Sequence, residues 1–190
     1  MASFSILAGY LAGSVPFAFL LARRVGIDVR QVGSRNVGAA NVLRNTGMGR
    51  ALVVTLLDVA KGAAAVAIAY ASAGGNGVAA LTGTAAVVGH IYPVWLRFHG
   101  GKGVAVAAGV FAMLTPLATA IAMSLFLIIV SSTRYVSLGS VAATLALPPA
   151  AWLTGAPGAV VGAAAGTAGL ILFRHRGNLR RLTQGTEMKI

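Results

Sequence analysis

The chain has 190 residues, of which 57% are hydrophobic and only 9% are charged, and its mean hydropathy is +0.85. A soluble domain typically carries about 25% charged residues, so this chain has too little polar surface to fold in water, which predicts an all-α membrane protein. Its length suits one domain over residues 1–190. The absence of cysteine excludes disulfides, thiolate metal sites and a cysteine nucleophile.

The net charge of +12 comes from fifteen Lys and Arg residues against three acids. In a soluble protein this balance would suggest a nucleic-acid partner. Here, however, the basic residues form short clusters between long apolar runs, with few aromatic residues among them. This pattern is typical of the cytoplasmic loops of a membrane protein, so we expect membrane lipid and anionic substrates as partners and no nucleic acid.

The apolar runs are the predicted membrane helices. In chain order they cover residues 3–22, 51–71, 78–96, 104–133, 138–153 and 156–173. A membrane helix needs roughly 20 apolar residues. The first run lacks a preceding basic segment and ends at Arg23-Arg24, which favours a retained helix over a cleaved signal peptide.

The fourth run decides the helix count. Proline lacks a backbone donor and disfavours helix in the residue before it, so we expect a break at Thr115-Pro116. Two helices here place every Lys and Arg except Lys61 on one side of the membrane. The sequence therefore predicts seven transmembrane helices, with the N-terminus external and the C-terminus cytoplasmic. The helix over 104–114 is short for a full span.

The first segment suited to chemistry is G-S-R-N-V-G-A-A-N-V-L-R, residues 33–44. Positive-inside bias explains its arginines but not the glycines and amides packed among them. Free backbone N–H groups beside a guanidinium are what a phosphate group needs. The candidate binding residues in this segment are Ser34, Asn36, Gly38, Asn41 and Arg44.

The second segment is G-H-I-Y-P-V-W-L-R-F-H-G-G-K-G, residues 89–103. Its last four residues, Gly100, Gly101, Lys102 and Gly103, look like a phosphate loop. The Walker pattern G-x-x-x-x-G-K-[ST] fails, however, because Leu96 stands where its first glycine should be and Gly103 where its Ser or Thr should be. We therefore expect an anion site at a helix start rather than a nucleotide site. His90, near a helix end, is interpreted as structural.

Two further segments are R-Y-V-S-L-G-S, residues 134–140, and R-H-R-G-N-L-R-R-L, residues 174–182. Ser137 and Ser140 lie at the start of a predicted helix, where serines are usually caps. A basic tail usually meets anionic lipid. However, His175 and Asn178 are three residues apart and share a helical face, which is more than lipid contact requires.

The acids are too few for several mechanisms. Asp58 and Lys61 are three apart within one membrane run and are expected to form a structural ion pair. Three acids, one of them in the tail, cannot build a carboxylate metal site or a paired-acid mechanism, so no metal and no cofactor are expected. The H-x-x-x-x-D acyltransferase motif is missing, because no His is followed five residues later by Asp.

Taken in order, the four segments and the D-x-x-K-G at residues 58–62 resemble the bacterial acyl-phosphate:glycerol-3-phosphate acyltransferase family, often called PlsY. The resemblance runs from G-S-V-P-F-A-F-L-L-A at Gly13 to the tail. Two positions depart from it: Ala40 stands where the family often has threonine, and Gly177 stands where it often has an acidic residue.

The resemblance implies an integral protein of the bacterial inner membrane whose active site faces the cytoplasm. Its reaction would be acyl transfer from a fatty acyl phosphate to the 1-hydroxyl of sn-glycerol 3-phosphate, giving lysophosphatidic acid and phosphate. The expected catalytic residues are Ser34, Arg44, Lys102 and His175. The expected substrate-binding residues are Asn36, Gly38, Asn41, Gly100, Gly101, Gly103, Ser137, Ser140 and Asn178.

Two questions stay open at the level of sequence. His175 is the only titratable candidate for a general base near the basic face, and a substrate phosphate oxygen is the alternative proton acceptor. The alternative function is a small transporter or flippase for an anionic lipid precursor. It would need polar groups near the bilayer midplane, and only Asp58 and Lys61 qualify.

Overall fold

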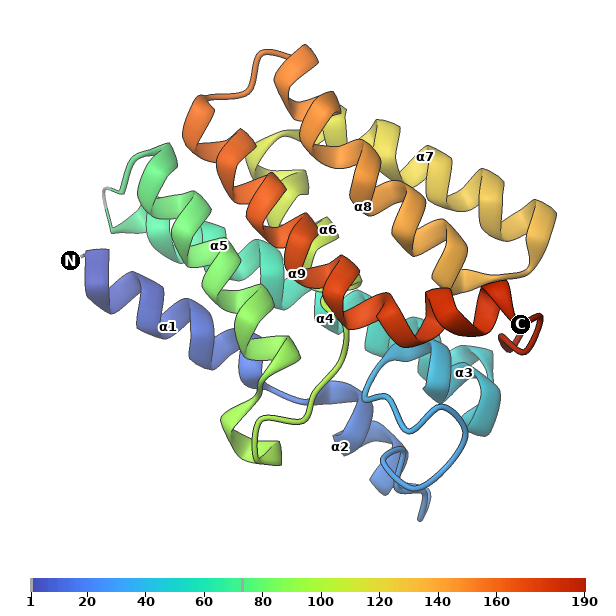
Figure 1. The fold of residues 1–190 in the computed structure, drawn as a ribbon. Coiled ribbons are helices and arrows are strands. Elements are labelled where there is room, and N and C mark those ends of the chain that lie inside the picture. Colours follow the sequence, from blue (N-terminus) through green and yellow to red (C-terminus); the bar gives the residue numbers. More distant parts are fainter. Residues whose placement is uncertain (1, 73) are drawn as a thin grey trace. The chain divides into compact units, whose positions relative to one another are not determined.

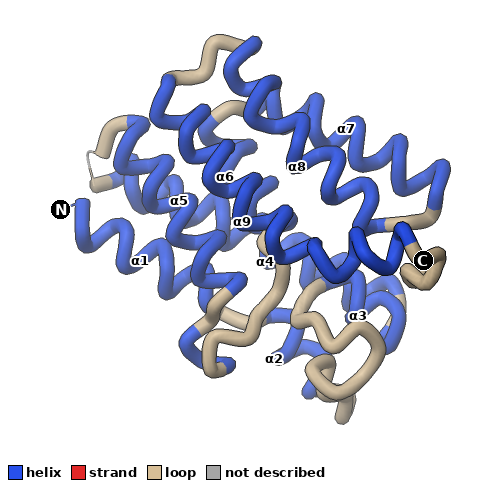
Figure 2. Tube along the Cα trace, viewed as in Figure 1, coloured by secondary structure: helices blue, strands red, loops and turns tan. Residues whose placement is uncertain are grey.

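The computed structural model describes residues 2–72 and 74–190, and every regular element within those ranges is helical (Figures 1 and 2). The chain divides into two compact units, residues 1–110 and 111–190. The division falls after Val110, within helix α6 (Val104–Leu114).

The first unit contains the helices that precede the division. They are α1 (Ala2–Ser14), α2 (Phe17–Arg23), α3 (Ala39–Thr46), α4 (Met48–Ala71), α5 (Asn76–Ile91) and the 3-10 turn η1 (Val94–Leu96), and the unit also includes α6 (Val104–Leu114) as far as Val110. The prediction of one continuous helix over 3–22 was wrong. The helix breaks at Val15-Pro16 because proline has no N–H to continue the hydrogen-bond ladder.

Close helix approach in this unit depends on glycine. Helix α1 packs against α4 and α5, and α4 also packs against α2, α3 and α5. A Cβ at Gly13 of α1 would collide with the backbone of Ala86 in α5. Small residues at such crossings let helix backbones approach, which is how membrane helices gain packing contacts.

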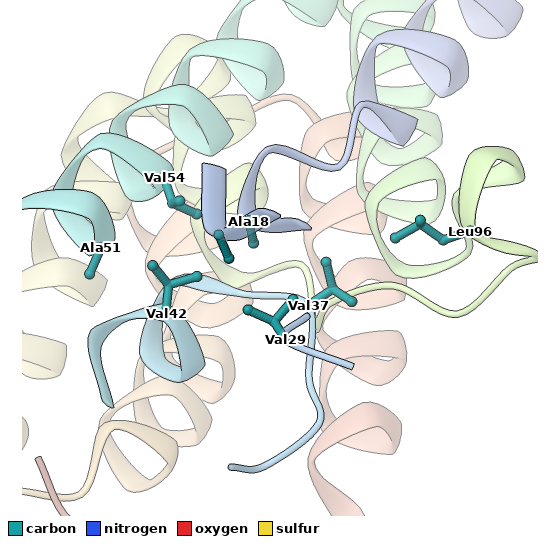
Figure 3. Packing of buried hydrophobic residues seen from close by; sticks show 8 residues of the cluster. Ala18, Val29, Val37, Val42, Ala51, Val54 and Leu96 are labelled. Atoms are coloured by element: carbon teal, nitrogen blue, oxygen red, sulfur yellow. The ribbon is translucent and has the colours of Figure 1, made fainter. Parts of the chain in front are cut away.

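A small apolar cluster fixes the loop between α2 and α3. Figure 3 shows its buried side chains converging from helices and loop alike. The members are Ala18, Ala22, Val29, Val37, Val42, Ala51, Val54 and Leu96. Val29 and Val37 belong to the loop itself and are almost completely buried. This burial holds the first motif in a defined conformation.

The second unit contains α7 (Pro116–Thr133), α8 (Val136–Leu153) and α9 (Gly158–Thr183), with α8 packed against both neighbours. The predicted break at Thr115-Pro116 is present, and Pro116 opens α7, a position where its missing N–H is not needed. Helix α9 continues ten residues past Phe173, so the fourth motif is helical. After α9, the tail returns to the connection between α7 and α8, where the Ile190 amide donates to the Arg134 carbonyl (3.0 Å).

Within residues 2–72 and 74–190, six helical stretches are long and apolar enough to cross a membrane. They are residues 2–23, 48–71, 76–96, 116–133, 136–153 and 158–183. Helix α6, with 11 residues, is shorter than a typical span. Its length matches the expectation that the helix over 104–114 is short.

Candidate active site

Asn41 organises the first motif from inside. Its side chain is fully buried in the first turn of α3. The Nδ2 group donates to the carbonyls of Val29 (2.9 Å) and Val32 (3.2 Å), while Oδ1 accepts from the amide of Ser34 (3.0 Å). The amide therefore closes the loop on itself, which accounts for an asparagine at this position.

The other candidates of this motif lie where a ligand can reach them. Ser34, Asn36 and Arg44 are partly exposed, and Gly38 is the residue that precedes α3. Ser34, Asn36 and Gly38 thus lie in the loop before α3, and Arg44 lies in the last turn of that helix. Such an array suits an anion, because helix N-termini and arginine forks both favour negative charge.

The second motif meets the first at Gly101. A Cβ on Gly101 would lie 2.6 Å from the Val37 carbonyl and would collide with the His90 ring. The amides of Gly100 and Gly101 donate to the carbonyls of Ile91 and His90 (both 3.1 Å). Glycine alone permits this approach, so the fold brings the two predicted glycine loops together.

Lys102 follows this contact directly. It is partly exposed, and its neighbours Gly101 and Gly103 are buried. Gly103 has φ +91°, a conformation that favours glycine, and it precedes the first residue of α6. A lysine held between two anchored glycines at a helix start is a fixed positive charge, as expected for an anion site.

In the second unit, all four candidates are buried: Ser137, Ser140, His175 and Asn178. Ser140 donates to the Val136 carbonyl (2.8 Å) within α8. His175 Nδ1 lies 2.9 Å from the Ile171 carbonyl. A carbonyl only accepts, so Nδ1 carries the proton and a neutral His175 has its lone pair on Nε2.

Glu187 is the residue that sequence reasoning missed. Its carboxylate accepts from Asn178 Nδ2 and from Arg181 Nε (2.7 Å), and its side chain is only 4% exposed. Burial alone would raise the pKa of Glu187, but hydrogen bonds from Asn178 and Arg181 hold it below its usual range. The available signal was rarity: Glu187 is one of three acids in the whole chain.

The carboxylate of Asp28 forms an ion pair with Arg30 in the loop just before the first motif. Asp28 accepts from Arg30 Nη2 (2.7 Å) and Nε (2.9 Å). This hydrogen bonding from Arg30 lowers the pKa of Asp28 to about 2, against the opposing effect of burial. The pair fixes a turn outside the candidate residues themselves.

The predicted pair of Asp58 and Lys61 is present, with Lys61 Nζ 2.8 Å from Asp58 Oδ1. Both side chains are at most 5% exposed. Among residues 2–72 and 74–190, no three His, Asp or Glu side chains lie close enough together to hold a metal ion.

Comparison with known proteins identifies the family. The family profile described as glycerol-3-phosphate acyltransferase matches residues 3–185. A glycerol-3-phosphate acyltransferase of Synechococcus sp. (strain CC9902) is 46% identical over 96% of this chain and 92% of its own. Another, from Rubrobacter xylanophilus, is 44% identical over 97% of this chain and 92% of its own.

Solved structures agree. The chain is similar to crystal structures of PlsY, an integral membrane glycerol 3-phosphate acyltransferase. The glycerol 3-phosphate form is 40% identical, with a TM-score of 0.95 over all of this chain and 95% of that one. The lysophosphatidic acid form is 39% identical, with a TM-score of 0.93 over the same shares. With several long apolar helices in the part of it that the structure describes, this chain is a multi-pass membrane protein, and it belongs to the glycerol-3-phosphate acyltransferase family.

Proposed function

We propose that this chain transfers a fatty acyl group from an acyl phosphate to the 1-hydroxyl of sn-glycerol 3-phosphate. The products are 1-acyl-sn-glycerol 3-phosphate, which is lysophosphatidic acid, and inorganic phosphate. One observation carries the proposal beyond family membership. The two glycine loops meet at Gly101 and Val37, with Lys102 just before the start of α6 and Arg44 on α3, the helix that follows the first loop, a setting suited to phosphate.

The chemistry requires little more than positioning and charge. The substrate hydroxyl oxygen attacks the acyl carbonyl carbon, the bond from that carbon to the phosphate oxygen breaks, and the hydroxyl proton ends on the released phosphate. Acyl phosphate is an activated anhydride with a good leaving group, so fixed donors that hold the reactants supply much of the rate. Arg44, Lys102 and Ser34, with the glycine amides, are assigned to phosphate binding and charge stabilisation.

In the second unit we assign His175, Asn178, Ser137 and Ser140 to substrate contacts. Two routes for the hydroxyl proton remain distinct. His175 can accept it at Nε2, since Nδ1 is engaged with the Ile171 carbonyl, or a phosphate oxygen of the substrate can take it directly. We favour a binding role for His175 because acyl phosphate already supplies basic oxygens.

The membrane arrangement is also part of the proposal. With α6 counted as a short crossing, the chain has seven transmembrane helices, an external N-terminus and a cytoplasmic C-terminus. All basic residues except Lys61 then lie on the cytoplasmic side of the bacterial inner membrane, where the active site opens. We propose that residues 1–190 act as one acyltransferase domain, because the family profile runs through both units.

Acyl transfer is tested with purified, detergent-solubilised protein, palmitoyl phosphate and glycerol 3-phosphate. We expect stoichiometric phosphate and lysophosphatidic acid, and no product from palmitoyl-CoA. The transporter alternative predicts no product but flux of an anionic lipid precursor in vesicles. It has lost its supporting feature, since the midplane candidates Asp58 and Lys61 pair with each other.

Topology is tested by thiol labelling, which the cysteine-free sequence makes simple. A cysteine at position 75 should react from outside, and cysteines at positions 35 and 176 only from inside. A seven-helix arrangement is refuted if position 176 reacts from outside in intact cells.

A further inference from the structure

Lys61 lies at the centre of a buried group of acceptors in the first unit. Its Nζ is 2.8 Å from Asp58 Oδ1, 2.8 Å from the Val15 carbonyl and 3.0 Å from His90 Nδ1. An ammonium has three donors and no acceptor. Lys61 therefore forms hydrogen bonds with the Val15 carbonyl and with His90 Nδ1 and an ion pair with Asp58. None of the side chains of Lys61, Asp58 and His90 is more than 9% exposed.

This arrangement determines the tautomer of His90. Because Lys61 Nζ can only donate, Nδ1 of His90 must accept, and the ring proton sits on Nε2. A proton on Nδ1 would face the ammonium at 3.0 Å, and the distance to Asp58 Oδ1 is 3.6 Å, too long for a hydrogen bond to compensate. His175 has the opposite tautomer, since its Nδ1 faces a carbonyl.

The far edge of His90 reaches the second glycine loop. A Cβ on Gly101 would collide with Nε2, and it would also lie 2.6 Å from the Val37 carbonyl oxygen. A small cavity beside the ring is lined by residues that include Asp58, Lys61, His90, Val37 and Gly100. The buried ion pair is thus connected through one imidazole to the point where the two motifs meet.

We propose that Lys61 and His90 are positioning residues for the phosphate site of the second loop. Lys61, held by Asp58 and the Val15 carbonyl, orients the His90 ring, and the ring holds Gly101 and so places Lys102. The inference rests on the proposed function, because it assigns Lys102 to phosphate. It goes beyond a structural ion pair, since the pair then determines how tightly phosphate binds.

The test uses variants that separate the two edges of the ring. In His90→Asn the amide oxygen can still accept from Lys61, but the edge toward Gly101 is lost; in His90→Gln the amide reaches the Nε2 position. Gly101→Ala disturbs the same contact from the side of the loop, because the added Cβ would collide with the His90 ring. Thr82→Val is the matched control, because it removes a buried polar group from the same helix, one for which no hydrogen-bond partner is found among the described residues.

We expect His90→Asn and Gly101→Ala to raise the dissociation constant of inorganic phosphate, measured by calorimetry, and the KM of a phosphate substrate by about tenfold, with kcat within about threefold of the parent. His90→Gln should recover most of the loss, and Thr82→Val should behave as the parent. The proposal is overturned if His90→Asn binds phosphate as tightly as Thr82→Val, or if kcat alone falls.

A readout on the unaltered site guards against variants that fail to fold. The chain has only three histidines, so ¹⁵N spectra can be assigned by elimination with His99→Gln and His175→Gln. His90 should show a protonated Nε2 and an unprotonated Nδ1; the reverse pattern would refute the arrangement. If the parent protein binds phosphate and shows this signal but transfers no acyl group, the proposed function fails while the positioning role stands.

Discussion

Replacing Glu187 with glutamine should lower both the stability of the protein and its turnover. The carboxylate accepts from Asn178 and Arg181, and its side chain is 4% exposed, so water screens these bonds little. A hydrogen bond to a charged group contributes about 1.5–3 kcal/mol. Glutamine keeps one acceptor oxygen but turns an amide donor toward another donor, so we expect a loss of about 2 kcal/mol, reduced somewhat because Arg181 is partly exposed.

The assay is thermal unfolding in detergent with turnover measured in parallel. For a chain of this size, 1 kcal/mol shifts Tm by about 2–4 °C, which predicts a fall of about 4–8 °C. Thr183→Ala, an exposed change in the last turn of α9, is the control and should leave Tm and turnover unchanged. Turnover should fall in the glutamine variant because Asn178 loses its hydrogen bond to the carboxylate.

The pH dependence has a defined sign. A carboxyl whose pKa is lowered by folding stabilises the protein above its unfolded pKa, and the stabilisation is lost as pH falls through the folded value. The parent should therefore lose Tm below about pH 4 more steeply than Glu187→Gln. Equal Tm, equal turnover and equal acid profiles in the two proteins would refute the role assigned to the carboxylate.

Further predictions concern the charged and titratable groups. Lys102→Ala should nearly abolish turnover while Tm stays close to that of the parent; parent-like rates would remove the second loop from the site. His175→Gln should keep much of kcat and mainly raise KM, because glutamine can offer a hydrogen bond at the Nε2 position but cannot take a proton, whereas a general base would lose about 10²–10⁴-fold in kcat. Acidification through the Asp28 pKa of about 2 should release the Arg30 pair, so Asp28→Asn should flatten the loss of Tm between about pH 4 and pH 2. Activity should survive dialysis against EDTA, and a loss restored by a divalent ion would contradict the metal-free mechanism.

The sequence by itself was enough to identify the membrane class, the helix break at Thr115-Pro116 and the family. These depend on composition, on the missing N–H of proline and on motifs of contiguous residues, all of which are local properties of the chain. The same local reasoning paired Asp58 with Lys61, since residues three apart share a helical face. It failed at Pro16, where the apolar run hides a break that the same proline rule could have predicted.

Only the tertiary structure decided which distant groups meet. Lys61 contacts His90 across 29 positions of sequence, Gly101 touches Val37 from another motif, and Glu187 folds back onto Asn178. No periodicity encodes these contacts, because they depend on how closely backbones approach and on which buried donors still need acceptors. That requirement to satisfy buried polar groups places His90 beside Lys61 in the first unit and Glu187 beside Asn178 in the second.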